Sequence, residues 1–252
     1  MDWLERSLDD REAAAPGAYD RSGAWIVDHA MRALAGGCAE QRRPLPPAGA
    51  VILGPDAVSV RLTTPDEAPP PGWDAGSHGR TWRASLTWLQ STAVDSGPAD
   101  PFPLLVSVGV IDEGRLLLNL AQAYGIISIE GDPGLARRLI HTWSRRLSTS
   151  PWSAGIRVIR VGLEPDPHFA GWDVSRLAEA APVLDEPEGG VLVLSERPQW
   201  GDLYSVNRLL AEPARRWAVV TAGADDASWR FLVDMSGTID TGLLAETVRP
   251  RS

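Results

Sequence analysis

The chain has 252 residues, with 24 basic against 33 acidic side chains and a net charge of −9, which argues against a nucleic-acid partner. Every basic side chain is an arginine, and this excludes Schiff-base chemistry, a lysine general base and a lysine-containing phosphate loop. The single cysteine, Cys38, excludes a disulfide framework and a multi-cysteine metal site and favours a reducing compartment.

The chain opens on acidic residues and contains no apolar run of about 18 residues, the length that a membrane-spanning helix needs. We therefore expect a cytoplasmic protein, or the cytoplasmic part of a larger one. It could belong to a membrane-associated assembly without entering the bilayer itself.

The first part of the chain is predicted to be a flexible or docking segment, residues 1–20, followed by a small α+β domain, residues 21–97. Residues 22–41 carry apolar side chains at helical spacing, and Ser22 is suited to be the N-cap of that helix. Proline and glycine residues then predict a hairpin of residues 51–53 and 58–62, a long loop over residues 66–79 and a further strand over residues 80–89.

The second part, residues 98–252, has the pattern of a larger α/β domain that follows a linker at Ser96-Gly97-Pro98. It begins with a predicted hairpin, residues 104–110 and 115–120. Buried strands are predicted at residues 125–129, 156–161, 191–194, 217–221 and 229–233, and helices at 135–148, 174–181 and 204–210. Apolar strands that alternate with amphipathic helices indicate a mainly parallel, covered sheet.

One predicted strand-to-helix turn lies in the frame of a nucleotide-binding phosphate loop, Gly-x-x-x-x-Gly-Lys-Ser/Thr. In that loop, backbone N–H groups wrap phosphate, the lysine reaches the outer phosphates and the hydroxyl group holds magnesium. The matching residues are Gly131, Asp132, Pro133, Gly134, Leu135, Ala136, Arg137 and Arg138. Ala136 replaces the second glycine, Arg137 the lysine and Arg138 the hydroxyl residue. Pro133 removes a donor and Asp132 adds negative charge, so we expect this phosphate-loop equivalent to be degenerate and empty.

A wider set of residues surrounds this turn: Pro103-Leu104-Leu105-Val106, Gly109, Asp112-Glu113-Gly114-Arg115, Asn119-Leu120, Gly125 to Ile129, Gly131, Gly134 and Arg145-Arg146-Leu147. With these residues, the stretch 103–223 resembles the start of FtsK/SpoIIIE-type motor domains, including the EccC ATPases of type VII secretion. The resemblance implies a P-loop NTPase-like α/β fold with a mainly parallel sheet and flanking helices. It also implies that residues 191–194 form the Walker B strand, with Ser195 at the metal-binding aspartate position and Glu196 at that of the catalytic carboxylate.

A weaker likeness covers most of the chain. It includes Ala30 to Pro46 and the closing stretch Trp229 to Pro250, and it is to the cytoplasmic regions of actinobacterial proteins that combine LysM and transcriptional-activator domains. This second resemblance implies a DNA-associated regulator, which the acidic balance of the chain argues against.

Other side chains carry weaker signals. The four histidines have no partner at metal-ligand spacing, so we predict no metal site, and no catalytic residue or cofactor is predicted either. Positive charge concentrates along the helix after the turn, on Arg138, His141, Arg145 and Arg146. These side chains form either a solvated face or a surface for an anion or an acidic partner. Three tryptophans in loop-like or terminal contexts are candidates for partner contact, namely Trp3, Trp73 and Trp200.

The hypothesis that we prefer from the sequence is a non-catalytic, P-loop-like pseudo-ATPase domain that acts as a protein-interaction scaffold or regulatory module. Its partner would be another protein, since the degenerate motor domains of EccC-type proteins are docking surfaces. Two alternatives stay open at this point. The first is an atypical NTPase that uses Arg137 for phosphate and Glu196 as base, and the second is the DNA-associated regulator.

Overall fold

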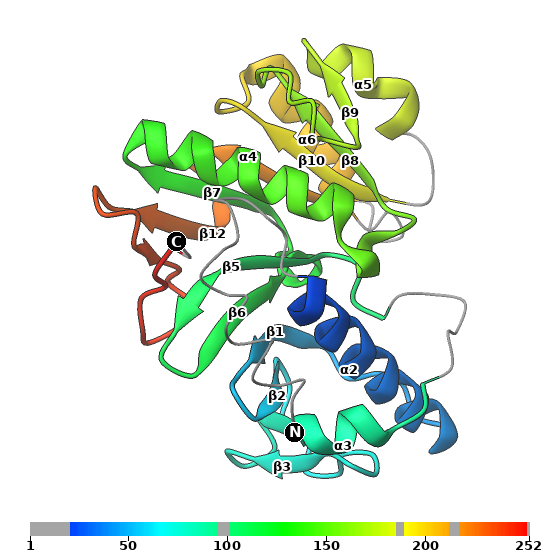
Figure 1. The fold of residues 1–252 in the computed structure, drawn as a ribbon. Coiled ribbons are helices and arrows are strands. Elements are labelled where there is room, and N and C mark those ends of the chain that lie inside the picture. Colours follow the sequence, from blue (N-terminus) through cyan, green and yellow to red (C-terminus); the bar gives the residue numbers. More distant parts are fainter. Residues whose placement is uncertain (1–20, 95–100, 185–188, 212–216, 251–252) are drawn as a thin grey trace.

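The computed structural model describes residues 21–94, 101–184, 189–211 and 217–250 (Figure 1). The predicted segment 1–20, Trp3 within it and the predicted linker at 96–98 lie outside the described residues. Within the described ranges the chain forms two β-sheets with helices between and beside them, so the architecture is α/β.

The first sheet has six strands in the order β3-β4-β2-β1-β6-β5, and all of its neighbouring strands are antiparallel. Its strands are β1 (Ala48–Leu53), β2 (Ala57–Leu62), β3 (Asp74–Gly76), β4 (Thr81–Ser85), β5 (Leu105–Ile111) and β6 (Gly114–Asn119). Helix α2 (Arg21–Glu40) buries its apolar stripe against this sheet, and the expected N-cap, Ser22, lies inside the helix. Cys38 is among its buried residues, and burial raises the pKa of the thiol.

The hairpin of β5 and β6, which follows the predicted linker, belongs to this first sheet. β6 pairs with β1 over four residue pairs, from Ala50 with Leu118 to Leu53 with Arg115. The apolar residues of β6 face both ways, because Leu117 packs beside α2 whereas Leu116 and Leu118 face the second sheet. Strands from both sides of the predicted linker are therefore hydrogen-bonded in one sheet.

The second sheet has seven strands in the order β13-β12-β7-β11-β10-β8-β9. Its strands are β7 (Ile126–Gly131), β8 (Arg157–Val161), β9 (Trp172–Val174), β10 (Gly190–Leu194), β11 (Trp217–Ala222), β12 (Ala227–Val233) and β13 (Ile239–Asp240). Every pairing in it is parallel except that of β12 with β13. The five central strands lie in the order β12, β7, β11, β10, β8. If they are numbered by their place in the chain, beginning with β7, this order is fifth, first, fourth, third, second. This mainly parallel sheet with flanking helices is consistent with a P-loop NTPase-like fold.

Helix α4 (Pro133–Thr149) lies between the two sheets and joins their cores. Ile140, Trp143 and Leu147 of α4 are buried in a cluster that takes residues from β1, β5 and β6 as well as from β7, β10, β11 and β12. The opposite face of the second sheet packs against α5 (Leu177–Leu184) and α6 (Trp200–Ala211). Figure 1 shows α4 on the near face of the sheet and α6 behind it.

Several local predictions need correction. The strand predicted over residues 80–89 ends at Ser85, whose hydroxyl accepts the Trp88 N–H and caps the short helix α3 (Leu86–Ser91). The loop predicted over residues 66–79 contains β3, and the helix predicted over 174–181 begins later, after the short strand β9. Trp73 is 4% exposed, so its predicted role in partner contact is wrong.

Candidate functional site

The carboxyl ends of the parallel strands meet at one edge of the second sheet, and the residues of the predicted phosphate loop lie there. Gly131 ends β7, Pro133 begins α4, and only Asp132 separates the two elements. The other residues of the frame lie in the first turns of α4, namely Gly134, Ala136, Arg137 and Arg138. The predicted strand–turn–helix frame is confirmed, but it contains no extended loop that could wrap a phosphate.

Asp132 closes the N-terminus of α4. Its Oδ1 atom accepts the backbone N–H of Leu135 at 2.8 Å, and its carbonyl oxygen accepts that of Ala136 at 2.9 Å. Pro133 has no N–H to offer. The Leu135 N–H, one of the donors that would bind an anion at a helix N-terminus, is therefore used within the chain, and a carboxylate lies beside the helix N-terminus.

The packing of β12 against β7 requires a residue without a side chain at position 131. Its φ is +101°, and a Cβ atom built there would lie 2.1 Å from the carbonyl oxygen of Val233 on β12. Asp132 donates its N–H to the same oxygen at 3.0 Å. The glycine that matched the start of a phosphate loop is thus explained by the close approach of β12 to the end of β7.

The structure brings together the two residues that the resemblance assigned to nucleotide chemistry. The Nη2 atom of Arg137 lies 4.0 Å from Oε1 of Glu196, and the two side chains are 63% and 75% exposed. Ser195, at the end of β10, donates its backbone N–H to the Val161 carbonyl oxygen at 3.0 Å. An ion pair this long and this exposed contributes at most about 1 kcal/mol to stability.

Further arginine–carboxylate pairs occupy the same edge. Arg230 bonds Glu130 at 2.5 Å, the hydroxyl of the buried Ser128 donates to the same carboxylate, and Arg197 pairs with Asp225. The edge therefore neutralises most of its own charge. Sequence reasoning missed these pairs because their members are 28 and 100 residues apart.

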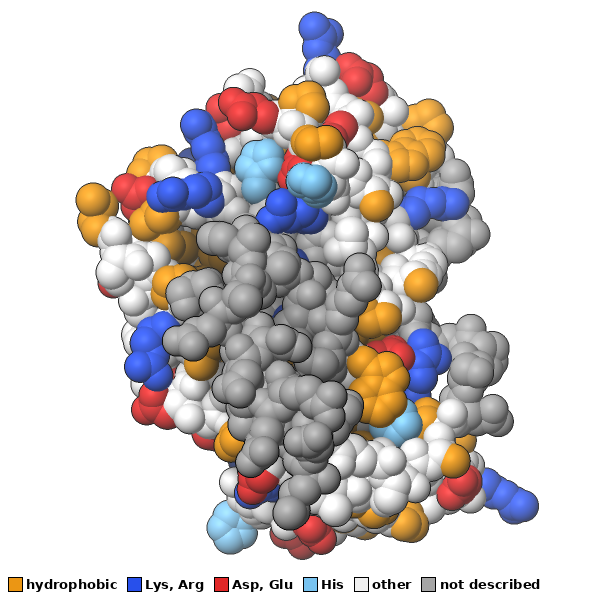
Figure 2. Space-filling view, viewed as in Figure 1, with side chains coloured by type: hydrophobic (Ala, Val, Ile, Leu, Met, Phe, Trp, Pro, Cys, Tyr) orange, Lys and Arg blue, Asp and Glu red, His pale blue; other side chains and the backbone are white. Residues whose placement is uncertain are grey.

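The predicted positive face of α4 is divided by its contacts. Arg146 donates to the Ser107 carbonyl oxygen at 2.7 Å, and Arg145 lies 4.0 Å from Asp166, whereas Arg138 is exposed. The backbone N–H of His168 hydrogen-bonds Asp166 and lowers the pKa of that carboxyl. Around α4, Figure 2 shows arginine, histidine and acidic side chains interspersed and no large patch of one sign.

Arg160 is a polar centre that no pattern in the sequence singled out. It lies on β8 with none of its side chain exposed, and both Nε and Nη2 bond the Asp173 carboxylate at 2.6 Å. The Phe169 ring lies 4.0 Å from its guanidinium carbon, and Nδ1 of His141 lies 3.4 Å from its Nη1. These contacts fasten the segment between β8 and β9 beneath α4. Because they are satisfied internally, they indicate a structural role.

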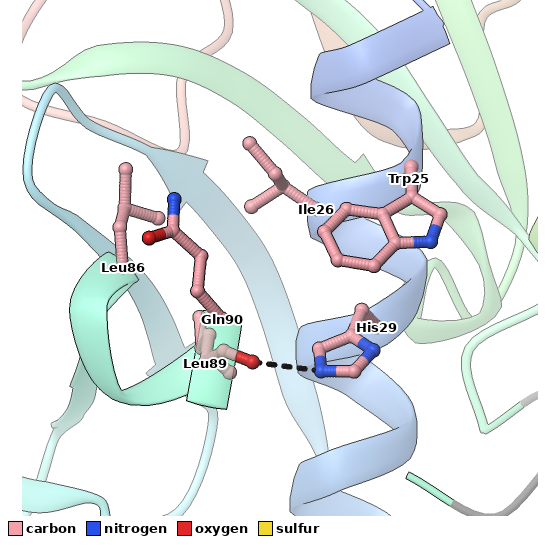
Figure 3. Close-up of a pocket in the computed structure, with 6 residues that line it drawn as sticks. All are labelled: Trp25, Ile26, His29, Leu86, Leu89 and Gln90. Atoms are coloured by element: carbon pink, nitrogen blue, oxygen red, sulfur yellow. Dashed lines mark hydrogen bonds between the residues drawn. The ribbon is translucent and has the colours of Figure 1, made fainter. Parts of the chain in front are cut away.

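Two hollows on the described surface do not suggest a small-molecule site. The notch between α2 and α3, which Trp25, His29 and Leu89 line, has a volume of about 10 Å³, enough for one water molecule at most (Figure 3). His29 fills part of it by bonding the Leu89 carbonyl oxygen at 2.8 Å. An open polar hollow of about 310 Å³ lies beside the β1–β2 and β5–β6 turns, where Asp56 is already paired with Arg83.

Two kinds of feature are absent from the described residues. They contain no group of three or more histidine, cysteine, aspartate or glutamate side chains arranged to hold a metal ion. None of the helices in the described ranges is long and apolar enough to cross a membrane.

Comparison with known proteins gives little further identification. No family model matches the chain, and no curated protein matches it at a significant level. Among solved structures, the monomer form of the pCW3 conjugation coupling protein TcpA with ATPγS is similar over 90% of this chain and 93% of that one. The TM-score is 0.39 and the identity 11%, so we transfer neither residues nor activity from it.

Proposed function

We propose that the chain is a non-catalytic, P-loop-like domain that acts by binding another protein, as an interaction scaffold or a regulatory module. One observation carries the proposal. The carboxylate of Asp132 occupies the N-terminus of α4, where the phosphates of a nucleotide would have to bind. A bound phosphate would have to displace this cap and would meet its negative charge.

The side chains at the edge of the sheet support the same proposal. Arg137 lies near Glu196, Arg197 pairs with Asp225 and Arg230 bonds Glu130, so these carboxylates compete with a nucleotide for the charge of the three arginines. Ser195 stands where a magnesium-binding carboxylate would be needed, and a serine hydroxyl is a weak substitute for it. The reduced, buried Cys38 fits action in the cytoplasm.

A second candidate, an atypical NTPase, is favoured by the proximity of Arg137 and Glu196. The 4.0 Å between their charged atoms would let them act on one ligand, with the guanidinium holding phosphate and the carboxylate acting as base. This alternative requires Asp132 to leave the helix N-terminus when the nucleotide binds.

Calorimetry with Mg-ATP and Mg-GTP separates the two candidates. For the scaffold we expect no saturable heat at millimolar nucleotide, either with the wild-type chain or with Arg137→Ala. Micromolar binding that Arg137→Ala abolishes would overturn the scaffold proposal and establish the alternative.

A further inference from the structure

Residues 246–250, which we call the strap, lie between the two sheets and hydrogen-bond to both (Figure 1). Val248 and Ile239 of β13 each donate their backbone N–H to the carbonyl oxygen of the other at 2.8 Å. Arg249 and Val110 of β5 do the same at 2.9 Å. The strap is therefore an extended segment whose successive residues pair with strands on opposite sides of it.

The first sheet leaves room for the strap at Gly109 of β5. A Cβ atom built there would lie 2.3 Å from the Arg249 carbonyl oxygen and 2.7 Å from Cγ1 of Val248. The Val248 side chain is 0% exposed and belongs to the core that both sheets share. A glycine in β5 and a buried place for a β-branched side chain together form a site for an extended chain.

The charges of the strap complement those of the first sheet. Nη2 of Arg249 lies 2.7 Å from the Asp112 carboxylate in the β5–β6 turn. The carboxylate of Glu246 lies 3.5 Å from Nη2 of Arg61 on β2. The site thus matches an acidic residue, then a β-branched residue two positions later, then an arginine.

Few contacts hold the strap in place. Of residues 242–250 only Val248 is buried, and residues 241–247 belong to no helix or strand. Segments with one buried side chain and a few backbone hydrogen bonds are the parts of a fold that open locally while the rest stays folded. Release of the strap would expose the paired groups of Val110 and Ile239 for another extended chain.

We propose that the strap is an intramolecular ligand that closes a peptide-binding site between β5 and β13. When the strap is released, the site takes an extended segment of a partner protein that carries the same pattern of acid, β-branched residue and arginine. The inference rests on the proposed scaffold function, for which it names a partner site and a contact that regulates access to it.

Hydrogen exchange in the full wild-type chain tests whether the strap opens. The amides of Val110, Ile239 and Val248 should exchange at least about tenfold faster than those of Val219 and Val220, which lie between two parallel neighbours in the second sheet. Equal exchange rates would overturn the proposal, because the strap would then open only when the whole chain unfolds.

Peptide binding tests the site itself, with a fluorescently labelled peptide that has the sequence of residues 244–250. In fluorescence anisotropy, the full chain with Val248→Asp should bind this peptide at least about tenfold more tightly than the wild-type chain, whose own strap competes. A peptide with aspartate in place of Val248 should not bind. Failure of the Val248→Asp chain to bind, with its circular dichroism unchanged, would overturn the proposal.

A variant of β5 places the peptide. Gly109→Ala combined with Val248→Asp should lose about tenfold or more in affinity, because the methyl group meets the positions of Val248 and Arg249. Gly36→Ala with Val248→Asp is the matched control, since a methyl group there meets nothing within 4 Å, and it should bind as Val248→Asp does. Equal binding by the Gly109→Ala chain would overturn the site.

Light scattering of the wild-type chain separates a partner protein from a second copy. We expect a monomer, whereas a concentration-dependent dimer that Val248→Asp abolishes would overturn the partner segment and assign the site to the strap of a second copy. None of these results decides the scaffold proposal, which nucleotide calorimetry tests.

Discussion

Asp132 sits at the only position between β7 and α4, so this one side chain decides what the turn can bind. Three backbone interactions converge on it, from Leu135, Ala136 and Val233. Such capping makes a good helix start and a poor anion site, because the carboxylate uses the Leu135 N–H and places negative charge where a phosphate would need to bind.

Replacing Asp132 by alanine should destabilise the chain by about 1 kcal/mol, because the Leu135 N–H loses its acceptor. Asp132→Ser, which keeps an acceptor, should lose less. Urea unfolding measures both, with Glu67→Ala at an exposed position as the control that should change stability by less than about 0.5 kcal/mol. A loss in Asp132→Ala no larger than in the control would contradict the capping role.

Arg160 is the residue on which the segment beneath α4 depends most. Arg160→Met should cost about 2 to 3 kcal/mol, since it leaves the Asp173 carboxylate unpaired while that side chain remains only 34% exposed. The surface pair offers a comparison, because Arg83→Met breaks a contact with the exposed Asp56 and should cost less than about 1 kcal/mol. Equal losses in chemical denaturation would show that burial of Arg160 contributes nothing.

At the scale of elements, the contact of β7 with β12 depends on the absence of a side chain at Gly131. Gly131→Ala should destabilise by about 2 to 3 kcal/mol, because the new methyl group meets the Val233 carbonyl oxygen at a backbone angle that alanine avoids. Gly201→Ala, in α6 where a methyl group meets nothing within 4 Å, should instead gain about 0.5 kcal/mol. Thermal unfolding of both variants tests the contrast, and an equal response would contradict it.

The sequence predicted most of these elements because their signals are local. The apolar stripe of Leu135, Leu139, Trp143 and Leu147, with Ile140 beside it, identified α4. The residues Gly54-Pro55-Asp56 identified the turn between β1 and β2. The short strands were not predicted, because three residues carry too little local signal. β3 and β9 have three residues each, and their pairing with β4 and β8 supplies what their own sequences do not.

For the candidate site, the sequence predicted only the strand–turn–helix frame and not the contacts within it. Its position after a strand and before a helix is local information, and so is the loss of the lysine at position 137. The closure by Asp132 depends on where α4 starts, a boundary that propensity fixes only to within a few residues. The pairing of Arg230 with Glu130 depends on which strand lies beside β7, and no local pattern encodes that order.

At the scale of the whole molecule, α4 makes the two sheets share one hydrophobic core. Its buried residues contact strands from both sides of the predicted domain boundary, so neither half buries its apolar surface alone. The chain should therefore unfold in a single transition, with far-ultraviolet circular dichroism and tryptophan fluorescence coincident. Two separated transitions would show that the N-terminal sheet is an independent domain.

The charge of the whole molecule also bears on function. Its net charge of −9 repels polyanions, and Arg137, Arg197 and Arg230 at the carboxyl edge are paired with carboxylates of the same chain. A nucleotide would have to break these pairs and approach a chain of net negative charge.

The backbone amides of Leu135 and Ala136 report most directly on whether the turn before α4 is closed. In a ¹⁵N-labelled chain, both resonances should stay unshifted when Mg-ATP is added to millimolar concentration, because Asp132 retains their hydrogen bonds. Asp132→Ala should shift the Leu135 resonance without nucleotide, which verifies its assignment. A saturable shift of Leu135 and Ala136 on adding Mg-ATP to the wild-type chain would contradict the account and show that the turn binds phosphate.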